Sequence, residues 1–219
     1  MDTKIALIIG ATGATGSELV KQLLEDNHYS QVHIFVRCKP DLEHQKLHTH
    51  VVDFDQLDTW KDKLKGDVLF SAMGTTLKIA GSKAAQYKID YTYQHDVAQA
   101  AAHNRVPSLL LVSSVGSSSK SPFFYAKIKG QLEDAVSKLN FKQVCIFQPP
   151  FLDRGEFLRD NEKSGIKIMG LLNKLGILRS QRPMAVAFLA KQMIGVSNRM
   201  NNQRGMTYGV KDIWSLSKL

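Results

Sequence analysis

The chain has 219 residues, of which 43% are hydrophobic and 22% charged, as in an ordinary globular protein. Two cysteines are too few for a disulfide framework. No apolar run reaches the ~18 residues of a membrane span, and the N-terminus MDTKIALIIGATG lacks the features of a signal peptide. We therefore expect a cytoplasmic protein with one domain over residues 1–219, consisting of a core at about 4–150 and further elements at about 151–219.

The net charge of +9 raises the question of nucleic-acid binding. The basic residues are scattered, however, without basic runs interleaved with aromatic residues and without zinc-finger or helix-turn-helix spacing. An attraction for anionic small molecules, including phosphorylated cofactors, explains the charge equally well. We therefore expect no nucleic-acid partner.

Apolar runs that predict strands alternate along the chain with amphipathic runs that predict helices. The predicted strands are Ile5–Ile9, Val32–Val36, a short one around His50–Val52, Val68–Ala72, Leu109–Val112 and Lys142–Gln148. The predicted helices carry apolar stripes at Leu19, Val20, Leu23 and Leu24, at Ile89, Tyr93, Val97 and Ala101, and at Phe124, Ile128, Leu132, Val136 and Leu139. This alternation is typical of an α/β fold with a doubly wound parallel sheet, the Rossmann fold, with helices on both faces. The carboxyl ends of its strands then meet at one edge, where ligands bind.

The pattern loosens after Pro149-Pro150 and predicts a small C-terminal extension on the substrate side. The stretch GIKIMGLLNKLGIL at 165–178 is apolar and interrupted by glycines, so it could form a lid, face a partner or pack on the core. Pro183 can open a helix that runs to about Ser197, and Met206–Val210 could be a last strand.

A glycine-rich loop follows the first predicted strand in the sequence GATGATGSELV. Gly10, Gly13 and Gly16 have the spacing G-x-x-G-x-x-G between a strand and a helix. Such a backbone lets a pyrophosphate approach closely, and the N–H groups of the helix N-terminus favour the anion. We therefore expect a dinucleotide cofactor to contact this loop, with Thr12, Ala14 and Thr15 included.

The second strand ends in HIFVRCKP, with Arg37 and Lys39 where an NAD-binding protein has an acidic residue. A guanidinium can grip the 2′-phosphate of NADP, which a carboxylate would repel. This favours NADP(H) over NAD(H). Asp53 could accept a hydrogen bond from the adenine amino group or could cap a helix that starts near Gln56. Ala72, Met73 and Gly74 are small or flexible enough to let the cofactor lie against the backbone.

The segment SLLLVSSVGSSSKSPFFYAKIKGQLE at 108–133 runs from a strand through a serine-rich patch into a helix. Tyr125 and Lys129 are four residues apart, so they share one face of that helix, beside its apolar stripe and at the edge of a cleft. A neighbouring ammonium favours the ionised form of a tyrosine and makes it useful in acid–base chemistry. Ser114 could hold a substrate oxygen, and Ser113 is its rival for that role.

These motifs resemble the short-chain dehydrogenase/reductase family over about residues 4–150. The segments FSAMGTTLKIAGS, KIDYTYQHDVAQAAAHNRV and KGQLEDAV are similar to its atypical members, the Tat-interacting-protein-like oxidoreductases. The resemblance implies that Ser114, Tyr125 and Lys129 are catalytic and that the glycine loop and Arg37 bind NADP. Ser113, Tyr125 and Lys129 are expected to contact the cofactor as well. It also leaves open a protein partner or a second copy of the chain.

The chain departs from the family pattern in two places. The loop between Ser114 and Tyr125 is short, and Gln148-Pro149-Pro150 stands where extended members commonly have Arg-Pro-Gly. Two functions therefore remain: an NADP(H)-dependent oxidoreductase acting on a small carbonyl or alcohol, and an NADP(H)-binding regulator or scaffold with little turnover. A sugar-nucleotide epimerase is a third, for which the C-terminal region is too small. His44, His48 and His50 lack the accompanying ligands of a metal site, and we expect none.

Overall fold

The computed structural model describes residues 3–153, 182–199 and 205–218. The apolar stretch at 165–178, with its three possible roles, lies outside the described residues.

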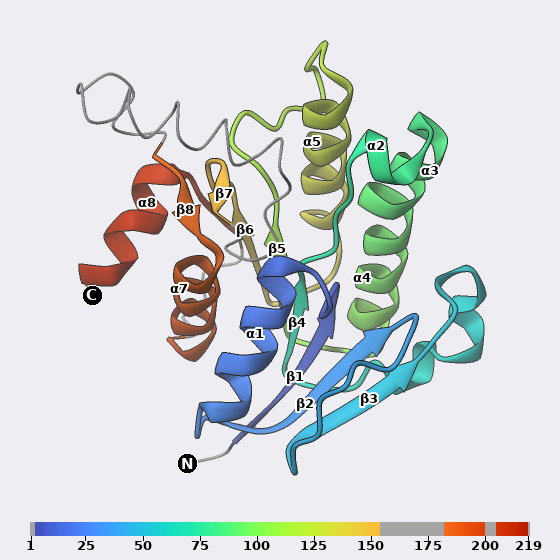
Figure 1. Ribbon diagram of the computed structural model, residues 1–219, viewed down its shortest axis with the longest axis vertical. Helices are drawn as coiled ribbons and strands as arrows, with labels where there is room; N and C mark the ends of the chain where they lie inside the picture. The colour runs from blue at the N-terminus through green and yellow to red at the C-terminus, as the bar shows by residue number, and fades with distance from the viewer. Residues whose placement is uncertain (1–2, 154–181, 200–204, 219) are drawn as a thin grey trace.

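Seven parallel strands form one sheet in the order β3-β2-β1-β4-β5-β6-β9 (Figure 1). Their bounds are β1 Lys4–Ile9, β2 Tyr29–Val36, β3 Leu47–Val51, β4 Val68–Ser71, β5 Ser108–Val112, β6 Gln143–Phe147 and β9 Gly205–Tyr208. The order reverses direction between β1 and β4, which is where doubly wound sheets open a crevice for ligands. The predicted Rossmann fold is confirmed.

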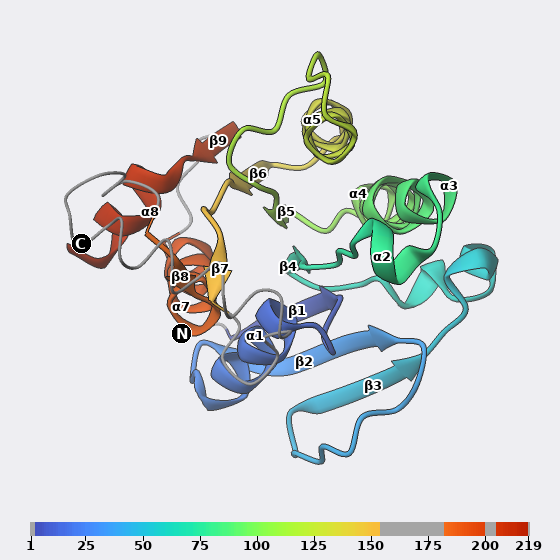
Figure 2. The same cartoon turned by 45° about the horizontal axis from the view of Figure 1, so that its top comes forward.

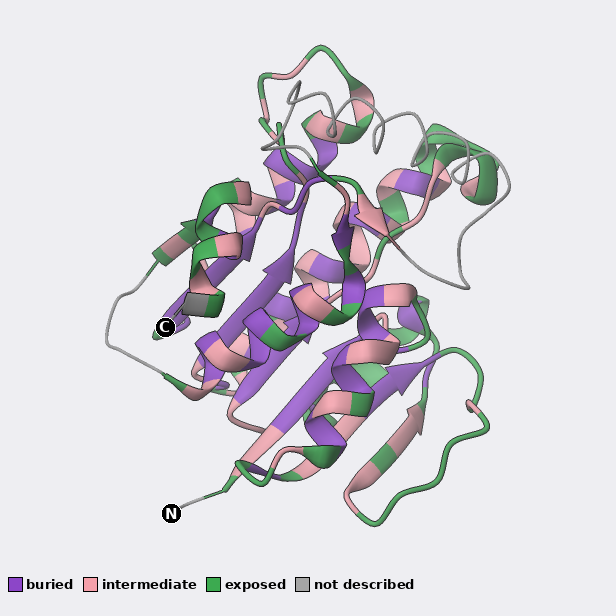
Figure 3. Ribbon diagram, turned by 60° about the vertical axis from the view of Figure 1, so that its left-hand side comes forward, coloured by how far each residue is buried: buried purple, intermediate pink, exposed green. Residues whose placement is uncertain are grey.

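Helices cover both faces of this sheet (Figure 2). Helices α1 (Ala14–Glu25) and α7 (Val186–Asn198) lie on one face, and α4 (Tyr93–His103) and α5 (Phe124–Val136) lie on the other. Because both faces are covered, every residue of β5 is buried, and the central strands are buried almost throughout (Figure 3).

The predicted helix through Ile89 is interrupted. Helices α2 (Leu77–Ala80) and α3 (Lys83–Tyr87) come first, and a π-helical turn at Lys88–Thr92 then leads into α4. This wider turn brings Asp90 into the interior, where its side chain has no exposed surface. Single π-helical turns of this kind are frequent at functional sites.

Two predictions for the C-terminal part need correction. Pro183 does not open a helix directly: Met184–Ala185 first forms strand β8, which pairs with β7 (Leu152–Asp153), and α7 begins at Val186. The last strand ends at Tyr208 and helix α8 (Val210–Ser215) follows it. Short 3-10 turns complete the described elements at Phe54–Thr59, Lys61–Lys63 and Leu216–Lys218.

Candidate functional site

The glycine loop turns sharply at the end of β1. Gly10 has φ +78°, and a Cβ there would lie 2.5 Å from the backbone nitrogen of Met73. Only glycine therefore allows β1 and the loop after β4 to approach in this way. Gly13 is the N-cap of α1, and no side chain caps this helix. Because no side chain caps the helix, the backbone N–H groups of its N-terminus stay available to an anion beside the loop.

A groove of about 460 Å³ runs along this loop, and its size and backbone walls fit a nucleotide cofactor. Of the predicted cofactor residues, the groove is lined by Gly10, Thr12, Gly13, Arg37, Ala72, Met73 and Gly74. The predicted cofactor residues outside the lining are Ala14, Thr15, Gly16, Asp53, Ser113, Tyr125 and Lys129. Gly16 packs against the loop instead, because a Cβ there would lie 2.0 Å from the carbonyl oxygen of Gly10.

Asp53 takes the second of the two roles left open by the sequence. Its exposed carboxylate accepts a hydrogen bond from the backbone N–H of Asp55 at 2.9 Å and caps the 3-10 turn Phe54–Thr59. Phe54, Ile89 and Tyr93 line the groove on this side, which the sequence analysis missed. In the sequence, these three residues are marked only by an apolar or aromatic side chain close to the carboxyl ends of the predicted strands.

Arg37 and Lys39 differ in position. Arg37 is exposed and lines the groove, whereas Lys39 is absent from the lining and its ammonium lies 4.0 Å from the carboxylate of Glu43. The geometry therefore brings only Arg37 to the groove.

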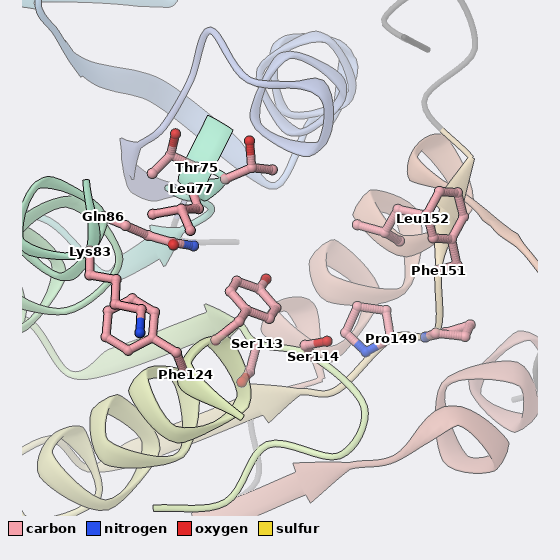
Figure 4. A pocket seen from close by; sticks show the side chains of 13 residues that line it. Thr75, Leu77, Lys83, Gln86, Ser113, Ser114, Phe124, Pro149, Phe151 and Leu152 are labelled. Carbon is pink, nitrogen blue, oxygen red and sulfur yellow. The ribbon is translucent and has the colours of Figure 1, made fainter. Parts of the chain in front are cut away.

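A second cavity, of about 470 Å³, opens at the same edge of the sheet (Figure 4). Its described lining is Thr75, Thr76, Leu77, Lys83, Gln86, Ser113, Ser114, Phe124, Tyr125, Pro149, Pro150, Phe151 and Leu152. Ser113, Ser114 and Tyr125 are thus brought together as the sequence predicts. Thr75 lines both this cavity and the groove, so the two spaces adjoin.

Lys129 does not lie at the cleft edge, and this prediction is wrong. Its side chain is buried, with the ammonium nitrogen 3.6 Å from Oδ1 of Asp90. The same oxygen accepts a hydrogen bond from the N–H of Thr75 at 3.1 Å, and a Cβ on Gly74 would lie 3.9 Å from the Lys129 nitrogen. The pair therefore lies beneath the loop shared by the two cavities. Asp90 was not predicted as a site residue, because its one signal in the sequence is a carboxylate next to an apolar stripe.

The serine-rich segment is packed against α5. A Cβ on Gly130 would lie 2.2 Å from the carbonyl carbon of Ser118, so a glycine is needed where the loop crosses the helix. The Ser118 N–H also donates to the carbonyl oxygen of Ala126 at 3.1 Å. These contacts hold the loop in one place at the cavity.

Glu133 distinguishes the two candidate serines. The Ser113 hydroxyl donates a short hydrogen bond to the Glu133 carboxylate, which also accepts from the Gln148 amide at 2.9 and 3.0 Å. The Ser114 hydroxyl makes only a 3.4 Å contact with the carbonyl oxygen of Val115. Ser113 is therefore engaged in a network that ties β5 and β6 to α5, and Ser114 is the serine whose hydroxyl can turn to a ligand.

The departure at Gln148-Pro149-Pro150 has a structural role. Gln148 binds Glu133, and the Pro149 carbonyl oxygen accepts a hydrogen bond from the N–H of Val115 at 3.0 Å. Pro149 and Pro150 then form part of the cavity wall. The two prolines thus give this part of the cavity wall an apolar surface.

Known proteins support this assignment of the groove. Residues 10–145 match the model of a family described as NAD(P)H-binding. Protein FMP52, mitochondrial, of Meyerozyma guilliermondii is 39% identical over 67% of this chain and 64% of its own length. Protein HTATIP2 of Rattus norvegicus is 34% identical over 71% of this chain and 66% of its own length.

Solved structures share the fold at low identity. An oxidoreductase of the short-chain dehydrogenase/reductase family from Burkholderia thailandensis superposes with a TM-score of 0.71 at 16% identity, covering 100% of this chain and 94% of that one. The Bordetella bronchiseptica enzyme WbmG in complex with NAD gives 0.71 at 14% identity, covering 99% and 78%. Identities this low establish the fold alone.

The expectation of a cytoplasmic protein is wrong. FMP52 relatives from several yeasts are named as mitochondrial, which points away from a purely cytoplasmic location. No helix among the described residues has the length and apolar character needed to cross a membrane. The groove, the family match and the fold lead to one conclusion: the chain belongs to the NAD(P)H-binding family and has the fold of a short-chain dehydrogenase/reductase.

Proposed function

We propose that the protein is an NADP(H)-dependent oxidoreductase that transfers hydride to or from the carbonyl or alcohol carbon of a small molecule. The observation that carries this proposal is the junction of the two spaces at Thr75, which puts the cavity with Ser114 and Tyr125 next to the groove. A substrate in the cavity would then lie against the nicotinamide end of a cofactor in the groove.

The groove residues hold the cofactor in this proposal. Backbone groups of Gly10, Thr12 and Gly13, together with the N-terminus of α1, bind the pyrophosphate. Arg37, exposed at the groove, would hold the 2′-phosphate through its guanidinium. The bound nicotinamide supplies or accepts the hydride.

The cavity residues manage the proton and the substrate oxygen. Tyr125, which is 43% exposed, donates a proton to the oxygen in reduction and accepts it in oxidation. Ser114 holds that oxygen by a hydrogen bond. Lys129 supplies positive charge beneath the site, and Asp90 keeps the ammonium in position.

A screen of NADPH oxidation across aldehydes and ketones tests whether the protein turns over. We expect at least one carbonyl compound to be reduced in a reaction that consumes NADPH in equal amount. NADPH binding without oxidation by any compound would instead favour the regulator or scaffold, which a protein partner or a second copy would then engage.

A further inference from the structure

The cavity beside Tyr125 has an uneven distribution of charge. Its described lining includes one ammonium, that of Lys83, and no carboxylate. Of the other twelve described lining residues, half are polar without a formal charge and half are apolar, namely Leu77, Phe124, Pro149, Pro150, Phe151 and Leu152. A ligand that fills this space therefore meets a single positive charge and, in the described lining, no negative one.

Lys83 has no acidic partner among the described residues. Its ammonium nitrogen lies 5.3 Å from the centroid of the Phe124 ring, a cation–π contact that keeps the charge at the cavity. Lys88, on the turn that follows, is instead paired with Asp55 at 2.7 Å. The charge of Lys83 is thus available to an anion from solution.

Gln86 adds a second polar group on the same side of the cavity (Figure 4). Its side chain is only 3% exposed, and within the described ranges no hydrogen bond reaches its amide. The amide is not among the fully buried polar atoms that lack a partner, so it is open to the cavity. Figure 4 shows this amide projecting into the space between Lys83 and Leu77. The cavity therefore presents an amide donor, with no protein partner among the described residues, to which a bound anion can accept a hydrogen bond.

We propose that this cavity binds small molecules that carry a carboxylate, held by the Lys83 ammonium and the Gln86 amide. One positive charge and one amide donor match a singly charged anion. The next step rests on the proposed function: the carboxylate site and the hydride transfer together imply that the substrate is an oxo acid. Its apolar part lies against Pro149 and Pro150. Hydride adds to its carbonyl carbon and a proton to its oxygen, giving a hydroxy acid and NADP.

The test compares para-formylbenzoate with its methyl ester, which has the same aromatic aldehyde but no charge. Dissociation constants are measured by calorimetry with the NADP-loaded protein, so that no hydride is available. We expect the carboxylate to bind about tenfold more tightly, the ratio given by one charge-assisted hydrogen bond. Lys83→Met should abolish this preference and Gln86→Leu should reduce it. Lys78→Met, which removes an exposed lysine of α2 outside the cavity lining, is the matched control and should retain it.

Equal affinities in the unmutated protein, or a preference that survives Lys83→Met, would overturn the anion site. NADPH oxidation by both compounds is measured in parallel. Charge-selective binding without oxidation would uphold the site and count against the oxidoreductase. Oxidation of NADPH by both compounds, with equal binding of the acid and the ester, would uphold the oxidoreductase and count against the anion site.

Discussion

Arg37 is the residue on which the choice of cofactor depends. It is exposed at the groove, while Lys39 is absent from the groove lining and lies near Glu43. We expect NADPH to bind more tightly than NADH, because a guanidinium attracts the 2′-phosphate and the described lining of the groove holds no carboxylate to bind the ribose hydroxyl. Arg37→Asp should reverse the order, measured by calorimetry, whereas Lys39→Asp should not. Equal affinities for the two cofactors in the unmutated protein would remove this role of Arg37.

Lys129 and Asp90 form a buried pair whose members depend on each other. Removing one partner of such a pair leaves the other charge buried without compensation. Lys129→Met should therefore lower the free energy of unfolding by about 3–5 kcal/mol, measured by urea denaturation. Lys127→Met, on the exposed side of the same helix, should change it little. A stable Lys129→Met protein would mean that the pair contributes nothing to folding.

At the scale of elements, strands β2 and β3 bring three histidines together. The His33 ring stacks on those of His48 and His50, with centroids 4.5 and 5.2 Å apart. Among the described residues no three His, Cys, Asp or Glu side chains gather as metal ligands would. Burial, and then repulsion by His48 and His50, lower the pKa of His33 from 6.5 to about 4.

This shift predicts acid sensitivity of the sheet edge. Between pH about 4 and about 6.5 the unfolded chain binds a proton at His33 that the folded protein does not. The contribution of His33 to the free energy of unfolding is therefore complete above pH about 6.5 and is lost as the pH falls toward about 4. His33→Gln should flatten the dependence of the urea midpoint on pH in this window. His103→Gln, at the exposed end of α4, should leave it as it is. An unchanged slope in His33→Gln would contradict the shift.

The serine-rich segment shows which elements can be predicted from sequence. The strand before it and the helix after it follow from apolar spacing, because a strand buried on both faces must be continuously apolar. The packing of the loop on Gly130 and the bond from Ser113 to Glu133 could not be predicted, because they join residues whose separation in space depends on the whole fold.

For the whole molecule, alternating strands and helices predicted the Rossmann fold and the edge at which the site lies. The positions of the glycine loop, Arg37, Ser114 and Tyr125 at this edge could be predicted because each stands just after a strand or on a helix face defined by spacing, and their roles stay predictions. Lys129 was misplaced because the carboxylate that pairs with it comes from a π-helical turn that regular helical spacing does not predict. The division of the chain into a core and a C-terminal extension within one domain stays a prediction.

The central claim is that Tyr125 moves the proton during hydride transfer. Tyr125→Phe removes only a hydroxyl from a side chain that is 43% exposed, so packing and NADPH affinity should be preserved. The most direct test is the single-turnover rate of hydride transfer from NADPH to the best carbonyl compound of the screen, unmutated protein against Tyr125→Phe. We predict a rate ~10²–10⁴-fold lower in the variant, the usual contribution of a positioned proton carrier. Equal rates, with NADPH bound equally well, would contradict the claim.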